Sequence, residues 1–276
     1  MNADWITPDW PAPPWVGAVC TTRAGGVSKA PFDKLNLGDH VGDAEGDVAA
    51  NRSNFARQIG AKPVFLNQVH GFEVAWLANG APHYEAADAC VTRQPGVACT
   101  IMVADCLPVL FANRLGTVVA AAHAGWRGLL GEPSPLVSRG GPSGVLERCY
   151  QEFSVLGLKN IAHTAIKNVV NDSLVWLGPC IGPRKFEVGS EVRDAFLALT
   201  PRVVDLFEPT TGGKWLADLP GLARHRLATL GIDQIYGNDG SDAWCTASNP
   251  SRFFSHRRDH AALGGSGRMA ASVWLA

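Results

Sequence analysis

Hydrophobic residues in this chain gather in short runs that end at turn-forming residues. Three runs rich in β-branched and small apolar residues are KPVFLNQVHG around Phe65, GVACTIMVADCLPVLFA from Gly96, and LGTVVAAAHAGWRG from Leu115. Glycine, proline or asparagine bounds each run, and this punctuation is typical of β-strands. A fourth apolar run, SLVWLGPCIGP, follows later in the chain. The pattern predicts strands in all four segments.

Helical periodicity marks three other segments. They are GDVAANRSNFARQIG near Phe55, GPSGVLERCYQEFSVLG near Leu146, and SEVRDAFLAL near Phe196. Their apolar residues recur three and four positions apart, as on one face of a helix. Ser190 is the expected N-cap of the third helix, because a serine side chain can accept a hydrogen bond from the first turn. Since strands and helices are interspersed, an α/β or α+β fold is predicted.

The chain of 276 residues, 46% of them hydrophobic, is long enough to bury one large core. Its only linker-like segment is GEPSPLVSRGGPSG, residues 131–144. Strand-like sequence resumes after it, so we expect an exposed loop within one domain. The opening segment carries Trp5, Trp10 and Trp15 and is expected to form an extended strap held by these tryptophans.

Charge and cysteine content narrow the classes of partner. The formal net charge is -1, with 24 basic and 25 acidic residues and no long run of either sign, so nucleic acid and anionic membranes are not expected partners. The N-terminus lacks a signal-peptide pattern, and no apolar stretch reaches the ~20 residues of a membrane span. Seven cysteines without a CxxC pair suit a reducing compartment. These features predict a cytoplasmic protein.

Three candidate ligands stand near the ends of apolar runs: His70 in NQVHG, Cys106 in VADCLPV, and His123 in AAHAGWRG. If these runs are neighbours in a sheet, the three side chains can converge. Two imidazoles and a thiolate suit zinc, which in a catalytic site keeps a fourth position for water. The same donors also suit copper.

Other interpretations of these residues stay open at this point. Either histidine could be a hydrogen-bonded structural residue, and the cysteine could be a small core residue. Cys106 and His123 could also act as nucleophile and base, with the imidazole holding the sulfur as a thiolate, as in cysteine hydrolases.

A longer set of motifs bears on this choice. In order along the chain they are TTRAGGVS, LNLGDHVGD, NQVHG, ADCLPV, AAHAGWRG, GPCIGPRKFEVG and FFSHRRD with a later GRMAA. The chain resembles the bacterial laccase-domain proteins, also called the polyphenol oxidase or peptidoglycan-editing-factor family. The likeness extends over nearly the whole chain. It implies an α+β fold, with one domain over residues 1–276 arranged in four layers, α/β/β/α, with mixed sheets. It also implies that His70, Cys106 and His123 are the metal ligands.

The resemblance implies several activities. The family was first named for copper-dependent oxidation of phenols, and purine nucleoside phosphorylase and adenosine deaminase activities were later associated with it. A zinc-dependent purine nucleoside enzyme acting on a nucleoside and phosphate is therefore expected. Copper-dependent oxidation is the weaker alternative, because eight histidines are few for a multicopper site. A Cys-His hydrolase or a role in editing cell-wall precursors is a further alternative. Neither the sequence nor the resemblance predicts an oligomeric state.

Two features depart from the family pattern. The segment between Gly128 and Trp176, about residues 129–175, is longer than usual, and Arg184-Lys185 stand where a cysteine-containing pair is common. The first is expected to alter access to the pocket and the second its charge.

The implied chemistry suggests further candidates. For deamination, Asp105 is the candidate proton shuttle, with a turn-capping role as its alternative, and Gln68 could bind a purine edge or be a surface residue. For phosphorolysis, Arg23 and Arg127 are the candidate phosphate ligands, because a guanidinium presents paired donors. The glycines after Arg23 could add backbone N–H groups for an anion. Arg257 and Arg258 are weaker candidates.

Overall fold

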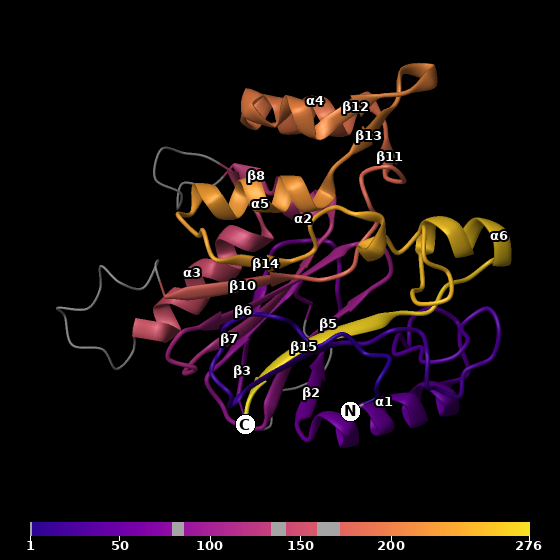
Figure 1. Cartoon of the computed structure of the whole chain (residues 1–276), viewed down its shortest axis with the longest axis vertical. Coiled ribbons are helices and arrows are strands. Elements are labelled where there is room, and N and C mark those ends of the chain that lie inside the picture. Colours follow the sequence, from indigo (N-terminus) through magenta and orange to yellow (C-terminus); the bar gives the residue numbers. More distant parts are fainter. Residues whose placement is uncertain (1, 79–85, 134–141, 159–171) are drawn as a thin grey trace.

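The computed structural model describes residues 2–78, 86–133, 142–158 and 172–276. Two β-sheets pack face to face, and helices cover both outer surfaces, so the layers run α/β/β/α (Figure 1). Both sheets contain parallel and antiparallel pairs. The expected α+β fold with four layers and mixed sheets is confirmed. Apolar residues from the inner faces of both sheets form the central core.

The first sheet has four strands in the order β1-β15-β5-β2. Its strands are β1 (Val16–Cys20), β15 (Met269–Leu275), β5 (Val97–Val103) and β2 (Lys62–Phe65). β5 and β15 are buried along their whole length, because one face meets the second sheet and the other meets α1 (Glu45–Ile59). On that outer face the rings of Phe55 and Trp5 lie 5.5 Å apart. The predicted helix near Phe55 therefore closes one side of the molecule.

The second sheet has six strands in the order β14-β10-β6-β7-β4-β3. Its strands are β14 (Ile235–Gly237), β10 (Ser173–Leu177), β6 (Leu107–Asn113), β7 (Val119–Ala124), β4 (Ala89–Thr92) and β3 (Val74–Leu77). Its outer face is covered by α2 (Trp126–Leu130), α3 (Val145–Leu158) and α5 (Leu219–Thr229) (Figure 1). The helix predicted near Leu146 is thus confirmed as α3.

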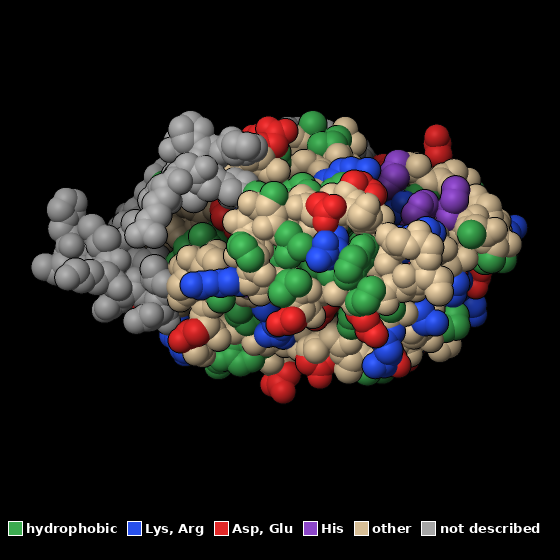
Figure 2. Space-filling view, turned by 90° about the horizontal axis from the view of Figure 1, so that it is seen from above, with side chains coloured by type: hydrophobic (Ala, Val, Ile, Leu, Met, Phe, Trp, Pro, Cys, Tyr) green, Lys and Arg blue, Asp and Glu red, His purple; other side chains and the backbone are tan. Residues whose placement is uncertain are grey.

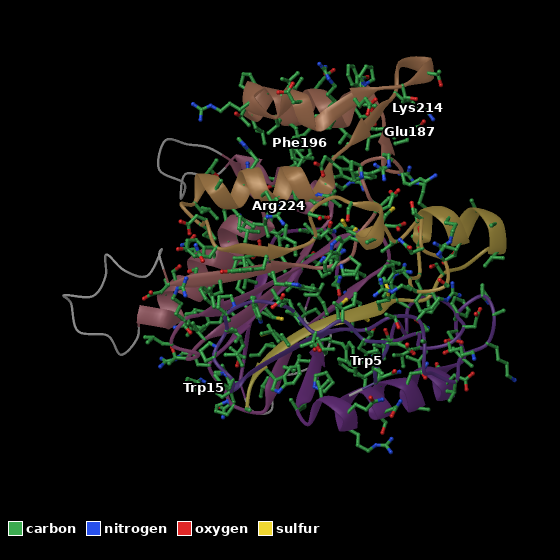
Figure 3. The ribbon with its side chains drawn as sticks, in the orientation of Figure 1. Trp5, Trp15, Glu187, Phe196, Lys214 and Arg224 are labelled. Carbon is green, nitrogen blue, oxygen red and sulfur yellow. The ribbon has the colours of Figure 1, made fainter. Side chains whose placement is uncertain are left out.

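A smaller unit stands above these layers. It comprises the three-stranded sheet β11-β13-β12 with α4 (Ser190–Leu199), and its strands are β11 (Glu187–Val188), β13 (Trp215–Ala217) and β12 (Phe207–Pro209). Phe196 packs from α4 onto Phe207 with 6.0 Å between their rings, and Lys214 Nζ donates to Glu187 Oε1 at 2.7 Å (Figure 3). This unit lies over α5 and one end of the second sheet (Figure 1).

The remaining described elements are short. They are the strand pair β8 (Glu132–Pro133) and β9 (Pro142–Ser143), the helical turns Pro201–Leu206, Thr211–Gly213, Asp242–Trp244 and His256–His260, and α6 (Ala261–Leu263). Residues 134–141 and 159–171, which belong to the predicted loop and to the long segment 129–175, lie outside the described residues. No helix in the described part of the chain is both long and apolar enough to cross a membrane.

Three sequence predictions need correction. Ser190 is the first residue of α4 rather than its N-cap; Gly189 takes that position, and no side chain caps the helix. The single apolar run from Gly96 divides into β5 and β6, which belong to different sheets, because the chain turns between Val103 and Leu107. The tryptophan strap is only partly packed: Trp5 is buried, whereas Trp15 is 50% exposed and lies far from it (Figure 3).

Candidate metal centre and adjoining pocket

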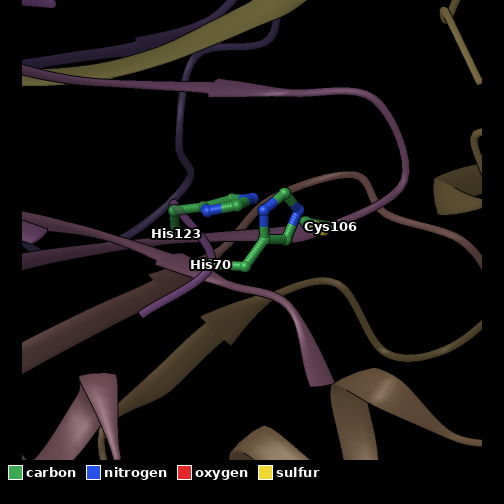
Figure 4. Close-up of side chains that lie close together, drawn as sticks. All are labelled: His70, Cys106 and His123. Atoms are coloured by element: carbon green, nitrogen blue, oxygen red, sulfur yellow. The ribbon is translucent and has the colours of Figure 1, made fainter. Parts of the chain in front are cut away.

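Three side chains converge as the sequence predicts, but from both sheets (Figure 4). His70 follows β2, Cys106 lies in the turn between β5 and β6, and His123 is on β7. Their ligand atoms all lie within 4.8 Å of one another. β2 and β5 belong to the first sheet, whereas β6 and β7 belong to the second. Cys106 directly precedes β6, which pairs with β7 so that Pro108 lies opposite His123. Two donors therefore come from neighbouring strands of one sheet, as expected, and His70 joins them from the end of the other sheet.

Asp88, which the sequence analysis did not single out, anchors two of these residues. Its Oδ1 lies 2.8 Å from His123 Nδ1, and its carboxylate accepts the backbone N–H groups of Val69, His70 and Gly71 at 2.7 to 3.1 Å. The carboxylate is fully buried. Since Nδ1 of His123 is engaged, Nε2 is the nitrogen left for a metal, an arrangement common among metal-binding histidines. The only sequence signal for Asp88 was an acid directly before a buried strand.

The backbone is strained at one residue of the cluster and at one residue next to it. His70 has φ 61° and Asp105, which precedes Cys106, has φ 92°, and non-glycine residues seldom adopt such values. Asp88 holds the first turn through its three backbone contacts. At the second turn the Asp105 carbonyl accepts from the backbone N–H of Ile181 at 2.9 Å. Strain of this kind concentrates at functional sites, where the surrounding structure must hold it.

Gly125 makes room for the cluster. A Cβ added at this position would lie 3.0 Å from Cys106 Sγ and 3.4 Å from His70 Cδ2. Any side chain here would therefore press on two of the three donors. The Gly-Trp-Arg turn after His123 does form one wall of the site, because Gly125, Trp126 and Arg127 all line the pocket.

Burial and mutual charge shift the ionisation of these groups. Burial disfavours the charged form of Cys106, but the charges and hydrogen bonds of His123 and His70 outweigh it and lower the pKa of the thiol to about 6. Burial also opposes the charging of His123, yet the Cys106 thiolate and Asp88 raise the pKa of its imidazole to about 9. With no metal bound, Cys106 and His123 thus form a thiolate–imidazolium pair. A metal ion would displace the imidazolium proton.

The residues present fit a metal ion. Two imidazoles and one thiolate form a donor set that zinc accepts, and copper can use the same donors. Asp88 fixes the ring of His123, and Gly125 leaves the space between Cys106 and His70 free of side-chain atoms. Elsewhere in the described residues, no other group of three His, Cys, Asp or Glu side chains lies close enough to hold a metal.

A pocket of about 400 Å³ opens beside the cluster. Its apolar lining includes Met102, Trp126, Ile181 and Phe186, and its polar lining includes Gln68, Asp105, and the side chains of His40, Arg127, His256, Arg257 and Arg268. A few polar groups among apolar walls are typical of small-molecule sites. On the face shown in Figure 2, several histidine side chains lie together at the end of the molecule that carries α6.

Asp105 and Gln68 both line the pocket, but their polar atoms already have partners. Asp105 Oδ1 accepts from the Thr246 hydroxyl at 2.6 Å and Oδ2 from the Arg257 backbone N–H at 2.7 Å. Gln68 Nε2 donates to the Met102 carbonyl at 2.8 Å, and its Oε1 accepts from the Met102 N–H at 2.7 Å. Gln68 therefore secures the end of β5 from a half-buried position.

The two arginines expected to bind phosphate lie in different places. Arg127 is exposed at the pocket, with its guanidinium 4.5 Å from the Trp126 ring centroid. Arg23 does not line the pocket: Nε donates to the Asp33 carbonyl at 2.8 Å and Nη1 to the Pro250 carbonyl at 2.9 Å. Nη2 pairs with the Asp33 carboxylate at 3.2 Å. These bonds tie two loops together, and the phosphate-binding role expected for Arg23 stays a prediction.

Arg184 and Lys185 do not contribute to the pocket. Arg184 is largely exposed and pairs with Asp242 at the surface. Arg258 is also a structural residue, because it pairs with Asp259 and donates to the carbonyls of Thr246 and Phe253. The departure from the family pattern at this pair of residues therefore does not alter the charge of the pocket wall.

Four cationic or titratable residues of the pocket were not predicted as site residues from the sequence, except that Arg257 was a weaker candidate for binding phosphate. They are His40, His256, Arg257 and Arg268. Each falls within one of the ordered motifs, LNLGDHVGD, FFSHRRD or GRMAA, so the motifs themselves were the available signal. Nothing in their local sequence indicates that they share one cavity.

Comparison with known proteins places the chain in a family. Residues 17–276 match the family described as multi-copper polyphenol oxidoreductase laccase. The chain belongs to this family. Among its relatives in the laccase family, the purine nucleoside phosphorylase PA4543 of Pseudomonas aeruginosa is 46% identical, over 100% of this chain and 99% of its own length. The purine nucleoside phosphorylase YfiH of Escherichia coli is 44% identical over 98% of both chains.

Solved structures of this laccase family share the fold. The crystal structure of Neisseria meningitidis protein NMB0706 superposes with a TM-score of 0.83 at 41% identity, covering 99% of both chains. That of YlmD from Geobacillus stearothermophilus has a TM-score of 0.81 at 29% identity, covering 100% of this chain and 97% of its own. The same four-layer arrangement thus recurs across distant bacteria.

Proposed function

We propose that this chain, as one laccase-type domain over residues 1–276, is a zinc-dependent purine nucleoside phosphorylase. The observation that carries this proposal is the pocket, which joins a His-Cys-His cluster, cationic side chains and apolar walls in one cavity. A nucleoside needs apolar surface for its base, and phosphate needs cationic donors. The names of two relatives at 44% and 46% identity support the same activity.

His70, Cys106 and His123 would hold the zinc ion, and Asp88 would orient His123. A bound zinc ion supplies Lewis-acid catalysis, polarising an oxygen or lowering the pKa of water. Copper is the alternative metal for the same donors. A multicopper oxidase needs further metal sites, and the described residues offer only this one group of donors, which favours nucleoside chemistry over phenol oxidation.

In phosphorolysis, an oxygen of hydrogen phosphate forms a bond to C1′ of the ribose while the bond from C1′ to N9 of the purine breaks. The base leaves with the electron pair of that bond and receives the proton that the hydrogen phosphate loses. The products are ribose 1-phosphate and the free purine. Trp126 and Phe186 provide aromatic surface for the base within the pocket, and the arginines balance the charge of the phosphate.

Adenosine deamination is a second activity that we assign to the same pocket. Water adds to C6 of the purine and ammonia leaves, so a proton must pass from the water to the amino group. Among the described residues that line the cavity, Asp105 is the only carboxylate. Its oxygens hold Thr246 and the Arg257 backbone in place, and the lone pairs that remain can accept and return the proton.

A Cys-His hydrolase would use the same Cys106 and His123 without a metal. It is the second candidate because the charge and hydrogen bond of His123 help to lower the pKa of the Cys106 thiol to about 6. In that mechanism His70 would not be needed as a ligand. A role in editing cell-wall precursors would use a substrate other than a nucleoside.

The deciding experiment is product analysis by mass spectrometry. Zinc-loaded protein is incubated with adenosine and inosine, with and without phosphate, and separately with a phenol in the presence of copper. We expect ribose 1-phosphate and free purine only when phosphate is present, and inosine from adenosine in both conditions. Oxidised phenol without nucleoside turnover would replace this proposal with the oxidase. Absence of turnover in all arms would reject it.

A further inference from the structure

Arg268 directly precedes β15 and lines the same pocket as the metal cluster. β15 pairs with β5 so that Met269 is opposite Val103, and this register places Arg268 beside Ala104, one residue before the strained turn at Asp105. Arg268 lines the cavity together with Cys106, and the charges of Cys106 and Asp105 act on its guanidinium. Arg268 is therefore a cation at the end of the first sheet, next to the turn that holds Asp105 and Cys106.

The guanidinium of Arg268 is held from one side only. Nη1 donates to the carbonyls of Ser266 and Gly267 at 2.9 and 3.1 Å. Within the described ranges, no carboxylate forms an ion pair with Arg268, and neither Nε nor Nη2 has an acceptor. Cys106 and Asp105 are the negative charges that act on this half-buried guanidinium, but neither accepts a hydrogen bond from it. Nε and Nη2 therefore remain available to the oxygens of an anion in the pocket.

The loop that carries His40 fixes the position of Arg268. Asn36 Oδ1 accepts from the Arg268 backbone N–H at 2.8 Å and from the Gly38 N–H at 2.9 Å. A Cβ at Gly38 would lie 2.7 Å from Arg268 Cγ, so the aliphatic part of the arginine packs on this glycine. Asn36 is fully buried. The arginine is thus ordered before a ligand binds, which reduces the entropy that binding must overcome.

The pocket around Arg268 is cationic. Arg127 and Arg257 also line it, and neither forms an ion pair with any described carboxylate. His40 and His256 flank Arg268 and present ring nitrogens that can donate a hydrogen bond. The carboxylate of Asp105 already accepts two hydrogen bonds. An anionic ligand with several oxygens matches this set of donors.

We infer that Arg268 binds the phosphate co-substrate, with Nε and Nη2 directed to its oxygens and with His40 and His256 beside it. This inference rests on the proposed phosphorylase function, and it replaces Arg23 as the phosphate-binding arginine. The phosphate oxygen that attacks C1′ then lies between Arg268 and the nucleoside.

The test uses zinc-loaded wild-type protein, Arg268→Gln and Arg268→Lys, with Arg252→Gln as the matched control. Arg252 is exposed and does not line the pocket. Phosphorolysis rates are measured against phosphate and adenosine separately, and binding of inorganic phosphate is measured by ³¹P NMR without nucleoside. For Arg268→Gln we expect the KM for phosphate to rise about tenfold or more, since a charged hydrogen-bonding group is lost. The KM for adenosine and the zinc content should stay within about twofold, as they depend on other side chains.

Arg268→Lys keeps the charge and the packing on Gly38 but loses the planar fork, so we expect an intermediate rise in the KM for phosphate. This variant also covers the case in which Arg268→Gln fails to fold. An unchanged KM for phosphate in both variants, with active wild-type protein, would overturn the inference and leave the phosphorylase function intact.

The binding measurement separates the two proposals. If the wild type binds phosphate, the Arg268 variants do not, and no nucleoside is phosphorolysed, the anion site stands and the proposed function fails. If the wild type does not bind phosphate at all, the inference is overturned.

Discussion

Asp88 Oδ1 lies 2.8 Å from His123 Nδ1, and the same carboxylate accepts the backbone N–H of His70 at 2.9 Å. One buried acid therefore orients two of the three candidate ligands, although it is not one of the three donors itself. His123 is fixed through its ring and His70 through its backbone. The geometry of the cluster depends on this residue as much as on the donors.

Asp88→Asn should weaken zinc binding by about 10 to 100-fold, as expected when the residue that orients a metal-binding histidine is changed. An asparagine is similar in size but lacks the negative charge that favours the required tautomer of His123. Zinc affinity is measured by competition with a chelator of known affinity. Asp242→Asn, at an exposed ion pair with Arg184, is the control and should bind zinc as the wild type does. Equal affinity in both variants would contradict the role assigned to Asp88.

Purified protein should carry about one zinc per chain, and His70→Ala, Cys106→Ala and His123→Ala should each lower zinc content and turnover together. Elemental analysis and activity are measured on the same preparations. This result separates the metal enzyme from a Cys-His hydrolase, in which His70→Ala would keep activity. Full activity in zinc-free protein, with Cys106 trapped in a covalent intermediate, would establish the hydrolase instead.

Removal of the metal should expose Cys106 to alkylation with an unusual pH dependence. The neighbouring imidazoles outweigh burial and lower the pKa of this thiol to about 6, from an ordinary value of 9.0. The thiolate is therefore present above about pH 6 and lost below it, so the iodoacetamide rate should rise around pH 6 and level off. The other six cysteines are buried and should react slowly. Peptide mass spectrometry identifies the site, and a midpoint near pH 9 would contradict the structure.

Gly125→Ala should reduce zinc occupancy without unfolding the protein. The added methyl group would lie 3.0 Å from Cys106 Sγ and 3.4 Å from His70 Cδ2, so the thiol donor must shift by a few tenths of an ångström and the His70 ring is left in close contact. Gly46→Ala in α1 is the matched control, because nothing lies within 4 Å of its added Cβ. Zinc content and circular dichroism are compared for the two. Normal occupancy in Gly125→Ala would show that the donors have more freedom than the structure indicates.

Arg23→Ala should lower stability by about 1 to 3 kcal/mol, because its hydrogen bonds to Asp33 and Pro250 join two loops. Urea unfolding measures this change. The KM for phosphate should not change, since Arg23 does not line the pocket. A raised KM for phosphate with unchanged stability would restore the assignment made from the sequence.

The sequence by itself determined the elements and the donor types. Alternating strands and helices at Phe55, Leu146 and the apolar runs predicted an α+β fold, because amphipathic periodicity is a short-range property that each segment carries alone. The ordered motifs also identified the three donors His70, Cys106 and His123, whose ligand atoms the structure brings within 4.8 Å of one another.

Only the tertiary structure decided the partners of these side chains. Asp88 meets His123 across 35 positions, and Asn36 meets Arg268 across 232. Arg23 looked suited to phosphate beside its glycines, yet each of its three side-chain nitrogens donates to Asp33 or Pro250. Which polar groups pair, and which remain free for a ligand, depends on the packing of strands from two sheets. That packing involves residues too far apart along the chain for any local pattern to report.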